Sequence, residues 1–447
     1  MLSTALSSGR SAAARLMPRG ASPRVADEVR RALEAPSARS GADDIERIVQ
    51  HAMSKVPFYQ RLNVTAFEDL PVVSKPMMVA EPQDFFAVGV RPERLTSRVS
   101  SGTSGIKFQA FIDADRIARH RAELVGAYRY LGTDPFGTFL HCRAWYQVPL
   151  HQRASYALRG QRLYAAEQDE ATIHGVARWL RRRPGTAIIG ICSYIESLLD
   201  RFDALGIELP PGTVSLVLGA GEPSTAHLRR MVRRQFGIDL RMRYSNTENG
   251  VMGFTSTAGS SYKLDTSTFH IEILHHDSDT PAPAGELGRI VVTDLYNRAM
   301  PFLRYDTGDL GRFAVDGSGH TIPNVLAELG GRARDFPIAG NRADPRRASH
   351  FTIIEPVELI PSIRQFQLRQ HDVGHFTWIL NADRSLELEA ELRRILDDTL
   401  GDIISCEVEY SDDTLHSGAE KRQTFVNEIS DSEELLRIAS ARARRDA

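Results

Sequence analysis

The residues with the clearest chemical potential form a run of glycine, serine and threonine between two stretches of strand-like sequence. Consecutive small residues expose backbone N–H groups, and their hydroxyls add further donors, so such a loop can surround phosphate oxygens. The loop lacks the GxxxxGK[ST] pattern and does not precede a helix, which argues against a Walker-type phosphate loop. The run reads Ser100, Ser101, Gly102, Thr103, Ser104, Gly105, Ile106, Lys107.

Lysine is scarce in this chain. Of 55 basic residues only five are lysines, and a coding preference for arginine would explain the imbalance by itself. A chain that avoids lysine nevertheless keeps it where a compact, strongly hydrated ammonium is needed. The five positions are therefore worth considering individually: Lys55, Lys75, Lys107, Lys263 and Lys421.

Composition limits the class of protein. The 447 residues carry a net charge of −2, with 42% hydrophobic and 25% charged residues. These values are typical of a globular protein of two or three domains, and the lack of a basic excess argues against a nucleic-acid-binding protein. No apolar run is long enough to predict a membrane-spanning helix.

The cysteines and the N-terminal residues bear on location. Only Cys142, Cys192 and Cys406 occur, without a CxxC pair, so neither a structural zinc site nor a disulfide framework is predicted and a cytoplasmic location fits. Residues 1–26 are rich in Arg, Ser and Ala. They resemble either a targeting segment or a frayed, disordered terminus.

Hydrophobic periodicity predicts an α/β protein. Helical spacing covers residues 27–62, 114–131, 170–183, 193–205 and 224–236, and short apolar runs at 187–191 and 214–218 separate some of these helices. Alternating strands and helices favour layered α/β architecture. Residues 268–315 are typical of hairpin strands, 328–348 of a linker, and the residues after 349 of a smaller α+β unit.

Five segments in a fixed order resemble the adenylate-forming (acyl-CoA synthetase) superfamily. The Ser/Gly/Thr loop resembles its phosphate-binding loop, and the other four resemble its adenine-contacting turn, its Tyr-Gly-x-Thr/Ser-Glu motif, its Tyr-Arg-Thr-Gly-Asp motif and its Gly-Arg-x-x-Asp hinge. Residues 56–59, 67–75 and 299–305 resemble the phenylacetate–CoA ligase and CapK-like branch. The four later segments are residues 219–223 (GAGEP), 244–248 (YSNTE), 304–310 (RYDTGDL) and 331–335 (GRARD).

The resemblance implies a fold and a domain organisation. It implies a large N-terminal nucleotide- and acyl-binding domain over residues 27–330, with layered sheets and helices and a small β-rich subdomain. A hinge follows over 331–348, with Asp335 as its pivot, and a small mobile α+β lid domain covers 349–447. Rotation of such a lid between two reaction steps is a common conformational device in enzymes.

The resemblance also implies ligands for the characteristic chemistry of the superfamily. ATP, Mg²⁺ and coenzyme A are the expected cofactors. Glu248 would hold Mg²⁺ between phosphate oxygens, because Mg²⁺ prefers one or two carboxylates together with phosphates. Thr247 would bind the α-phosphate, and Lys421 would bridge the substrate carboxylate and that phosphate. Asp309 would accept both ribose hydroxyls, with Asp306 the less favoured candidate.

The remaining expectations concern nucleotide and substrate contacts. Arg332 would contact the ribose and phosphate side, and Lys107 the β- and γ-phosphates, while Lys75 is assigned a structural or surface position. Plausible lining groups of the acyl pocket are His141, Trp145, Tyr146 and Tyr194. The further cofactor-binding residues are Gly219, Ala220, Gly221, Glu222, Pro223, Tyr244, Ser245 and Asn246.

The sequence therefore predicts an AMP-forming carboxylate ligase that makes an acyl- or aryl-adenylate and passes the acyl group to coenzyme A. Two alternatives stay open at this point: transfer to an amine, an alcohol or a carrier-protein thiol, and a non-catalytic nucleotide-binding relative. The expected partner is a small carboxylic acid, and a homodimer is one possible assembly. His371 and His375, like His275 and His276, lack a matching third metal ligand and are expected to be solvated.

Overall fold

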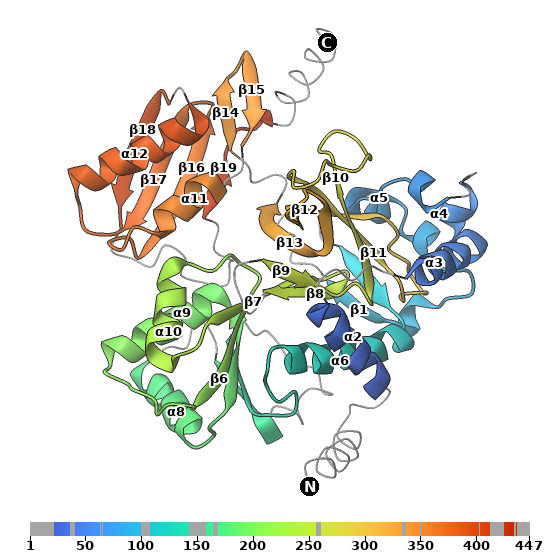
Figure 1. Ribbon diagram of the computed structural model, residues 1–447, viewed down its shortest axis with the longest axis horizontal. Coiled ribbons are helices and arrows are strands. Elements are labelled where there is room, and N and C mark those ends of the chain that lie inside the picture. Colours follow the sequence, from blue (N-terminus) through green and yellow to red (C-terminus); the bar gives the residue numbers. More distant parts are fainter. Residues whose placement is uncertain are drawn as a thin grey trace. The chain divides into compact units, whose positions relative to one another are not determined.

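The computed structural model describes thirteen stretches of the chain (Figure 1). The chain divides into two compact units. The first comprises Met1–Gly137 and Arg241–Leu329, and the second comprises Thr138–Leu240 and Gly330–Ala447. The described residues are 22–35, 41–62, 64, 66–99, 108–142, 158–163, 169–255, 261–332, 337–348, 351–401, 403–411, 424–432 and 435.

Helices in the first unit gather at its N-terminal part. The predicted helix over 27–62 is interrupted, because Gly41 is extended and precedes a new helix. The α6 helix begins where the Asp113 side chain accepts a hydrogen bond from Arg116 N at 2.7 Å. The helices are α2 (Pro23–Glu34), α3 (Ala42–Lys55), α4 (Pro57–Gln60), α5 (Lys75–Ala80) and α6 (Ala114–Tyr130), with short 3₁₀ turns η1 (Phe67–Asp69), η2 (Pro82–Phe85) and η3 (Pro92–Arg94).

The strands of the first unit form a mainly antiparallel sheet in the order β10-β11-β12-β13-β9-β8-β7 and a separate antiparallel pair, β1-β2. The predicted hairpins over 268–315 correspond to β10, β11 and β12. The bounds are β1 (Thr96–Val99), β2 (Gln109–Ile112), β7 (Leu240–Asn246), β8 (Gly250–Thr255), β9 (Tyr262–Leu264), β10 (Phe269–Leu274), β11 (Gly288–Asp294), β12 (Tyr305–Val315) and β13 (Thr321–Arg332).

The second unit contains a parallel arrangement in the order β6-β5-β3-β4. The apolar runs predicted as strands are buried almost throughout, as expected for parallel strands with covered faces. Helix α10 begins with a Thr225 cap and ends at Gly237, whose φ is 69°. The elements are β3 (Phe139–Cys142), β4 (Gly160–Leu163), α8 (Glu170–Arg181), β5 (Thr186–Ile191), α9 (Cys192–Ala204), β6 (Val214–Ala220) and α10 (Ala226–Phe236).

The C-terminal part of the second unit mixes strands and helices, as predicted. The stretch 328–348 is not wholly a linker: it includes the hairpin β14 (Ile338–Asn341) and β15 (Asp344–Arg347), whose turn is fixed because Asn341 Oδ1 accepts hydrogen bonds from the backbone of residues 343 and 344. A sheet of order β18-β17-β16-β19 follows. Its elements are α11 (Phe351–Glu358), β16 (Gln365–Asp372), β17 (His375–Asn381), α12 (Leu386–Leu400), β18 (Ser405–Tyr410) and β19 (Phe425–Asn427).

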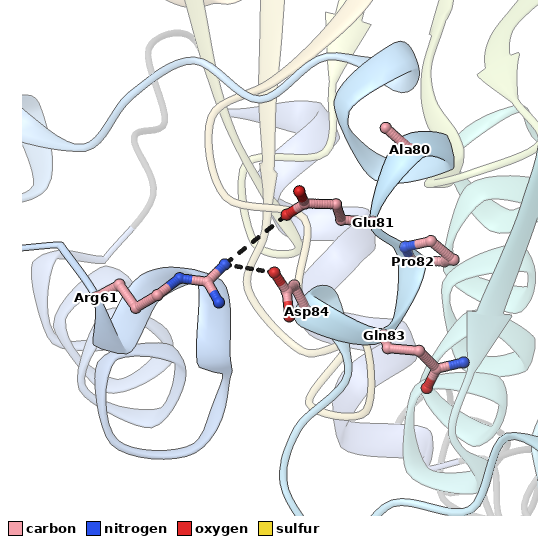
Figure 2. A pocket seen from close by; sticks show the side chains of 6 residues that line it. All are labelled: Arg61, Ala80, Glu81, Pro82, Gln83 and Asp84. Carbon is pink, nitrogen blue, oxygen red and sulfur yellow. Dashed lines mark hydrogen bonds and ion pairs between the residues drawn. The ribbon is translucent and has the colours of Figure 1, made fainter.

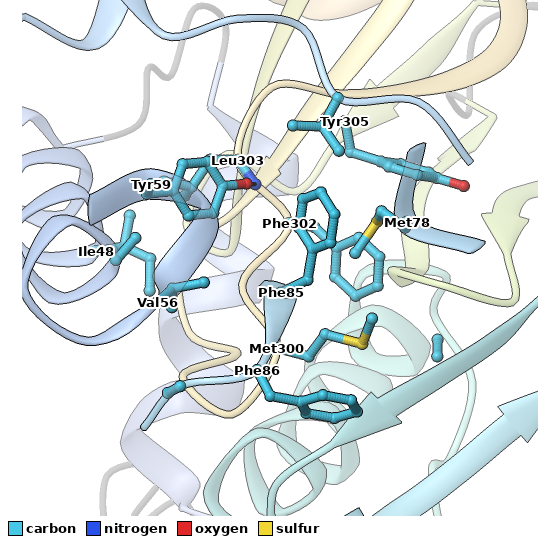
Figure 3. Packing of buried hydrophobic residues seen from close by; sticks show 14 of the residues in the cluster. Ile48, Val56, Tyr59, Met78, Phe85, Phe86, Met300, Phe302, Leu303 and Tyr305 are labelled. Carbon is cyan, nitrogen blue, oxygen red and sulfur yellow. Dashed lines mark hydrogen bonds between the residues drawn. The ribbon is translucent and has the colours of Figure 1, made fainter. Parts of the chain in front are cut away.

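An aromatic cluster joins the N-terminal helices to β12. Tyr59, Phe85, Phe302 and Tyr305 are almost fully buried, and the Phe302 and Tyr305 rings meet edge to face with centroids 5.2 Å apart (Figure 3). Met78 of α5 is buried in the same cluster. Burial of these side chains fixes the start of β12 relative to α5 through the hydrophobic effect.

A buried network of charges connects α6, β11 and the turn after β7. Arg116 Nε donates to Asp294 Oδ2 at 2.7 Å, and Arg116 Nη1 donates to Glu123 Oε1 at 2.9 Å. Arg116 Nη2 also donates to the Asn249 carbonyl at 3.2 Å. Burial opposes ionisation of Glu123, but Arg116 and His120 outweigh it and lower the pKa of Glu123 to about 2. Each of these charges is compensated, which a buried ion needs.

Asp265 is less well compensated. Its Oδ1 accepts hydrogen bonds from Ser267, whereas Oδ2 is buried without a hydrogen-bond partner. Burial, with the nearby negative charge of Glu123, raises the pKa of Asp265 to about 6.

Among the described residues, no helix is long and apolar enough to cross a membrane.

Asp265→Asn is expected to stabilise the protein, and more so at high pH. Because the folded-state pKa of Asp265 is raised above its unfolded value, its contribution to stability is lost as pH rises through about 6. The amide cannot ionise, so the free-energy gain of the variant should grow by about 1 kcal/mol between pH 5 and pH 8. Urea unfolding across that range measures it. Asp383→Asn, at a fully exposed position, controls for the lost negative charge. A gain that does not change with pH would contradict the assignment.

Candidate active site

The turn between β7 and β8 carries Thr247 and Glu248, the residues predicted to contact phosphate and metal. The two strands pair antiparallel, with Asn246 opposite Gly250. Asn246 Oδ1 accepts a hydrogen bond from Asn249 N at 2.7 Å, and Gly250 has a φ of 93°, which favours glycine. The turn is therefore held by its own residues, and the Glu248 side chain is only 6% exposed.

Two groups from distant parts of the first unit bind the Glu248 carboxylate. Lys75 Nζ lies 3.0 Å from Glu248 Oε1, and the Tyr305 hydroxyl donates to the same oxygen at 3.3 Å. The Lys75 side chain is 15% exposed, so this ion pair is largely withdrawn from water and weakly screened. Among the described residues, Glu248 has no further hydrogen bond or ion pair, so Oε2 is available to another ligand.

A one-residue β-bridge brings Lys75 to this carboxylate. Val73 N donates to Arg304 O at 2.9 Å, and Asp306 N donates to Val73 O at 2.9 Å, so Val73 runs parallel beside Tyr305. Lys75 then begins α5 two residues later. The sequence assigns Lys75 a structural or surface position, but the structure pairs it with a predicted site residue. Two signals in the sequence could have pointed to it: the scarcity of lysine in this chain, and the position of Lys75 in a segment that resembles the phenylacetate–CoA ligase branch.

Arg304 fixes the segment that precedes the bridge. It is the only non-glycine residue of the described chain with a positive φ, 44°. Its guanidinium donates to the backbone oxygens of Glu68 and Leu70 at 2.9 and 2.7 Å and forms an ion pair with Glu272 at 3.1 Å. These contacts compensate the strained backbone and attach the N-terminal segment to β12.

Asp309 and Asp306, the two candidates for the ribose contact, lie in different environments. The Tyr244 hydroxyl donates to Asp309 Oδ2 at 3.0 Å, so two residues of separate motifs meet in the first unit. Asp306 uses both oxygens internally, accepting Gly308 N at 2.8 Å and Arg289 Nη1 at 2.8 Å. The two carboxylates thus differ in their hydrogen-bond partners, and the choice of Asp309 for the ribose contact stays a prediction.

In the second unit, the turn predicted to contact adenine follows β6. Gly221 has a φ of 80°, which this turn requires. The Glu222 side chain accepts a hydrogen bond from Ser193 N at 3.0 Å, at the N-terminus of α9, where a negative charge is favourable. Its carboxylate is therefore held by the helix, and the backbone of the turn is the part that can contact a ligand. Tyr194 is buried on α9, and His141 lies on β3.

No known protein-family profile matches the chain. A curated relative, phenylacetate–coenzyme A ligase of Thermus thermophilus, is 27% identical over 428 residues, covering 87% of this chain and 88% of the relative. The phenylacetate–coenzyme A ligases of Pseudomonas putida and Escherichia coli are 31% and 33% identical, but each match covers 33% of this chain and 34% of the relative.

Solved structures agree in fold. 2-Hydroxyisobutyryl-CoA ligase in complex with 2-HIB-AMP superimposes with a TM-score of 0.64 at 16% identity, covering 91% of this chain and 94% of the other. ATP-bound MatB from Rhodopseudomonas palustris gives a TM-score of 0.51 at 17% identity, covering 79% and 69%.

The chain is thus similar along most of its length to a phenylacetate–coenzyme A ligase and shares its fold with solved acyl-CoA ligases. Both the α/β fold class and the resemblance to the phenylacetate–CoA ligase branch are thereby confirmed.

Several predicted site residues of this chain lie outside the described residues, so their positions stay predictions. Arg332 ends β13, and its side chain is not described. The predicted site residues that lie outside the described residues are Ser100, Ser101, Gly102, Thr103, Ser104, Gly105, Lys107, Trp145, Tyr146, Asp335 and Lys421.

Two other features of this chain involve residues outside the predicted site. A cavity of about 700 Å³ is lined by Arg61 and residues 80–84 (Figure 2), where Arg61 forms ion pairs with Asp84 and Glu81. None of these residues belongs to the predicted site. The described residues contain no cluster of three metal-binding side chains, and His371 hydrogen-bonds Glu428 and Thr377 instead.

A double-mutant cycle is expected to show strong coupling between Lys75 and Glu248. Lys75→Met leaves a buried carboxylate without its counter-ion and should cost about 2 kcal/mol of unfolding free energy. The same change should cost about 1–2 kcal/mol less when Glu248 is already glutamine, because no charge is then stranded. Urea unfolding of the four proteins measures this. Equal costs in both backgrounds would show that the ion pair contributes nothing.

Proposed function

We propose that this chain is an AMP-forming acid–CoA ligase. A carboxylate oxygen of the substrate attacks the α-phosphorus of ATP and pyrophosphate leaves, giving an acyl adenylate. The thiolate of coenzyme A then attacks the acyl carbonyl, and AMP leaves with the electron pair of the C–O bond. The alignment with a phenylacetate–coenzyme A ligase along nearly the whole of both chains carries this proposal.

The described geometry supports nucleotide binding in the first unit. Asp309 presents a carboxylate oriented by Tyr244, and an ionised carboxylate can accept two hydrogen bonds from a vicinal diol. Thr247 lies beside Glu248 on a turn fixed by the network around Arg116. A preorganised turn needs no rearrangement when charge develops at the phosphate, which is how enzymes stabilise such a transition state.

The chemistry of Glu248 fits a magnesium ion. Oε1 is held by Lys75 and Tyr305, and Oε2 has no partner among the described residues. One carboxylate oxygen together with phosphate oxygens is a typical ligand set for Mg²⁺, which would neutralise phosphate charge when bound. In this proposal Lys421 bridges the substrate carboxylate and α-phosphate, and the hinge allows the lid to move between the two half-reactions. A homodimer and a cytoplasmic location complete the proposal.

The deciding experiment is ATP–pyrophosphate exchange with a panel of aryl and aliphatic carboxylic acids, followed by mass spectrometry of products formed with coenzyme A. We expect exchange that depends on one class of acid and a CoA thioester of the same acid. Adenylate without thioester would instead favour an amine, an alcohol or a carrier-protein thiol as acceptor. Tight ATP binding without exchange for any acid would overturn the catalytic proposal.

Glu248→Gln is expected to lower the exchange rate at least about a hundredfold, because a neutral amide is a poor ligand for Mg²⁺ and loses transition-state charge stabilisation. The exposed Glu286→Gln variant is the matched control. Rates at saturating acid and several Mg²⁺ concentrations measure the effect. An unchanged rate at low Mg²⁺ concentration would exclude Glu248 as the metal ligand.

Asp309→Asn should raise the KM for ATP about tenfold with a smaller change in kcat, since it weakens binding of a non-reacting part of the substrate. Asp306→Asn is the comparison, because both oxygens of Asp306 already have partners inside the protein. Steady-state exchange kinetics on both variants distinguish the two carboxylates. A larger rise in KM for Asp306→Asn would reverse the assignment.

A further inference from the structure

The contact between Lys75 and Glu248 presents an electrostatic conflict. Glu248 is 6% exposed and its ion pair with Lys75 is 3.0 Å long, so the carboxylate is neutralised by a cation of the protein itself. A divalent metal bound to the same carboxylate would lie a few ångströms from the ammonium. In a site with little water, two cations at that separation repel each other strongly.

The side chains around Glu248 differ in how they could respond to a metal. Tyr305 is 1% exposed and its ring packs edge to face against Phe302, so the ring is held in place (Figure 3). Lys75 is the first residue of α5, has a flexible four-carbon chain and retains 15% exposure. An ammonium is also a point charge without a fixed hydrogen-bonding plane, so it can change partners at small geometric cost.

We propose that Lys75 is the resident counter-ion of Glu248 in the nucleotide-free site and exchanges with the metal. When Mg²⁺ binds Oε2 with the nucleotide, the ammonium moves from Oε1 to a phosphate oxygen. Lys75 thus keeps Glu248 from repelling the incoming triphosphate and then binds the triphosphate itself. This inference rests on the proposed function, because it takes ATP with Mg²⁺ as the ligand of this site.

The exchange predicts how loss of Lys75 changes the affinity for ATP with and without Mg²⁺. Without Lys75, the negative charge of Glu248 repels free ATP. In the Mg–ATP complex, the positive charge of Mg²⁺ neutralises this carboxylate in place of the lysine. The ratio of the Kd for free ATP to the Kd for Mg–ATP should therefore rise. Because binding is reciprocal, Mg²⁺ must bind the protein–ATP complex more tightly by the same factor.

Isothermal titration of the full-length protein with ATP in EDTA, and with ATP in excess MgCl₂, tests this without acid or turnover. For Lys75→Met we expect the ratio of the two Kd values to rise at least about tenfold over wild type, and the Mg²⁺ affinity of the ATP complex to tighten equally. Lys75→Arg keeps the charge and should stay within about threefold of the wild-type ratio. Circular dichroism confirms folding of each variant.

Two further variants separate charge from structure. Tyr305→Phe removes a neutral hydrogen bond from the same oxygen, so it should change both Kd values equally. Lys55→Met removes an exposed lysine at the end of α3 and should change neither. A merely structural Lys75 would also weaken both forms of ATP equally, leaving the ratio at its wild-type value, and that result would overturn the proposal.

Failure of this inference is distinguishable from failure of the proposed function. If wild-type protein binds neither form of ATP, the proposed function fails. If it binds both and the ratio is unchanged in Lys75→Met, only the role of Lys75 fails. Should Lys75→Met not fold, the Lys75→Gln variant, which retains a polar side chain without the charge, gives the same comparison.

Discussion

A carboxylate held at 6% exposure must have compensating charge nearby, and the first unit is organised around that requirement at Glu248. Lys75 supplies the charge from α5, and Tyr305 adds a hydrogen bond from β12. Neither could reach Glu248 unless Val73 paired with β12 and the aromatic cluster held α5 in place. One electrostatic constraint thus ties three segments that are far apart in the sequence.

A second set of contacts fixes the turn between β7 and β8, which carries Glu248. Arg116 is surrounded by Asp294 and Glu123 and donates to the Asn249 carbonyl, so a buried ion network continues directly into the backbone beside Glu248. Buried polar networks are rigid when every member is satisfied. Satisfaction is incomplete in this region: Asp265 Oδ2, Asn246 Nδ2 and both side-chain polar atoms of Asn249 are buried without a hydrogen-bond partner.

Much of the fold could be predicted because it leaves local patterns, whereas the roles of the candidate site residues stay predictions. Amphipathic spacing predicts α6, α8, α9 and α10, and the buried apolar runs predict β5 and β6. The single helix expected over 27–62 was wrong, because α2 ends at Glu34, α3 begins after Gly41, and α4 follows an extended Val56. The linker expected at 328–348 contains a hairpin. The residues of turns decide where helices and strands end, and hydrophobic periodicity detects turns poorly. Motif order, likewise, pointed to Glu248 and to Asp309 in preference to Asp306.

The sequence by itself determined the α/β class and the resemblance to the adenylate-forming superfamily, because these depend on residue type and local order. The residues assigned to phosphate, ribose and metal stay predictions. Only the tertiary structure decided which groups meet: Lys75 with Glu248, Tyr244 with Asp309, and Glu222 with the N-terminus of α9 rather than with solvent. These contacts join residues between 29 and 173 positions apart in the sequence. No local pattern encodes such distances, because long-range contacts arise from packing of the whole unit.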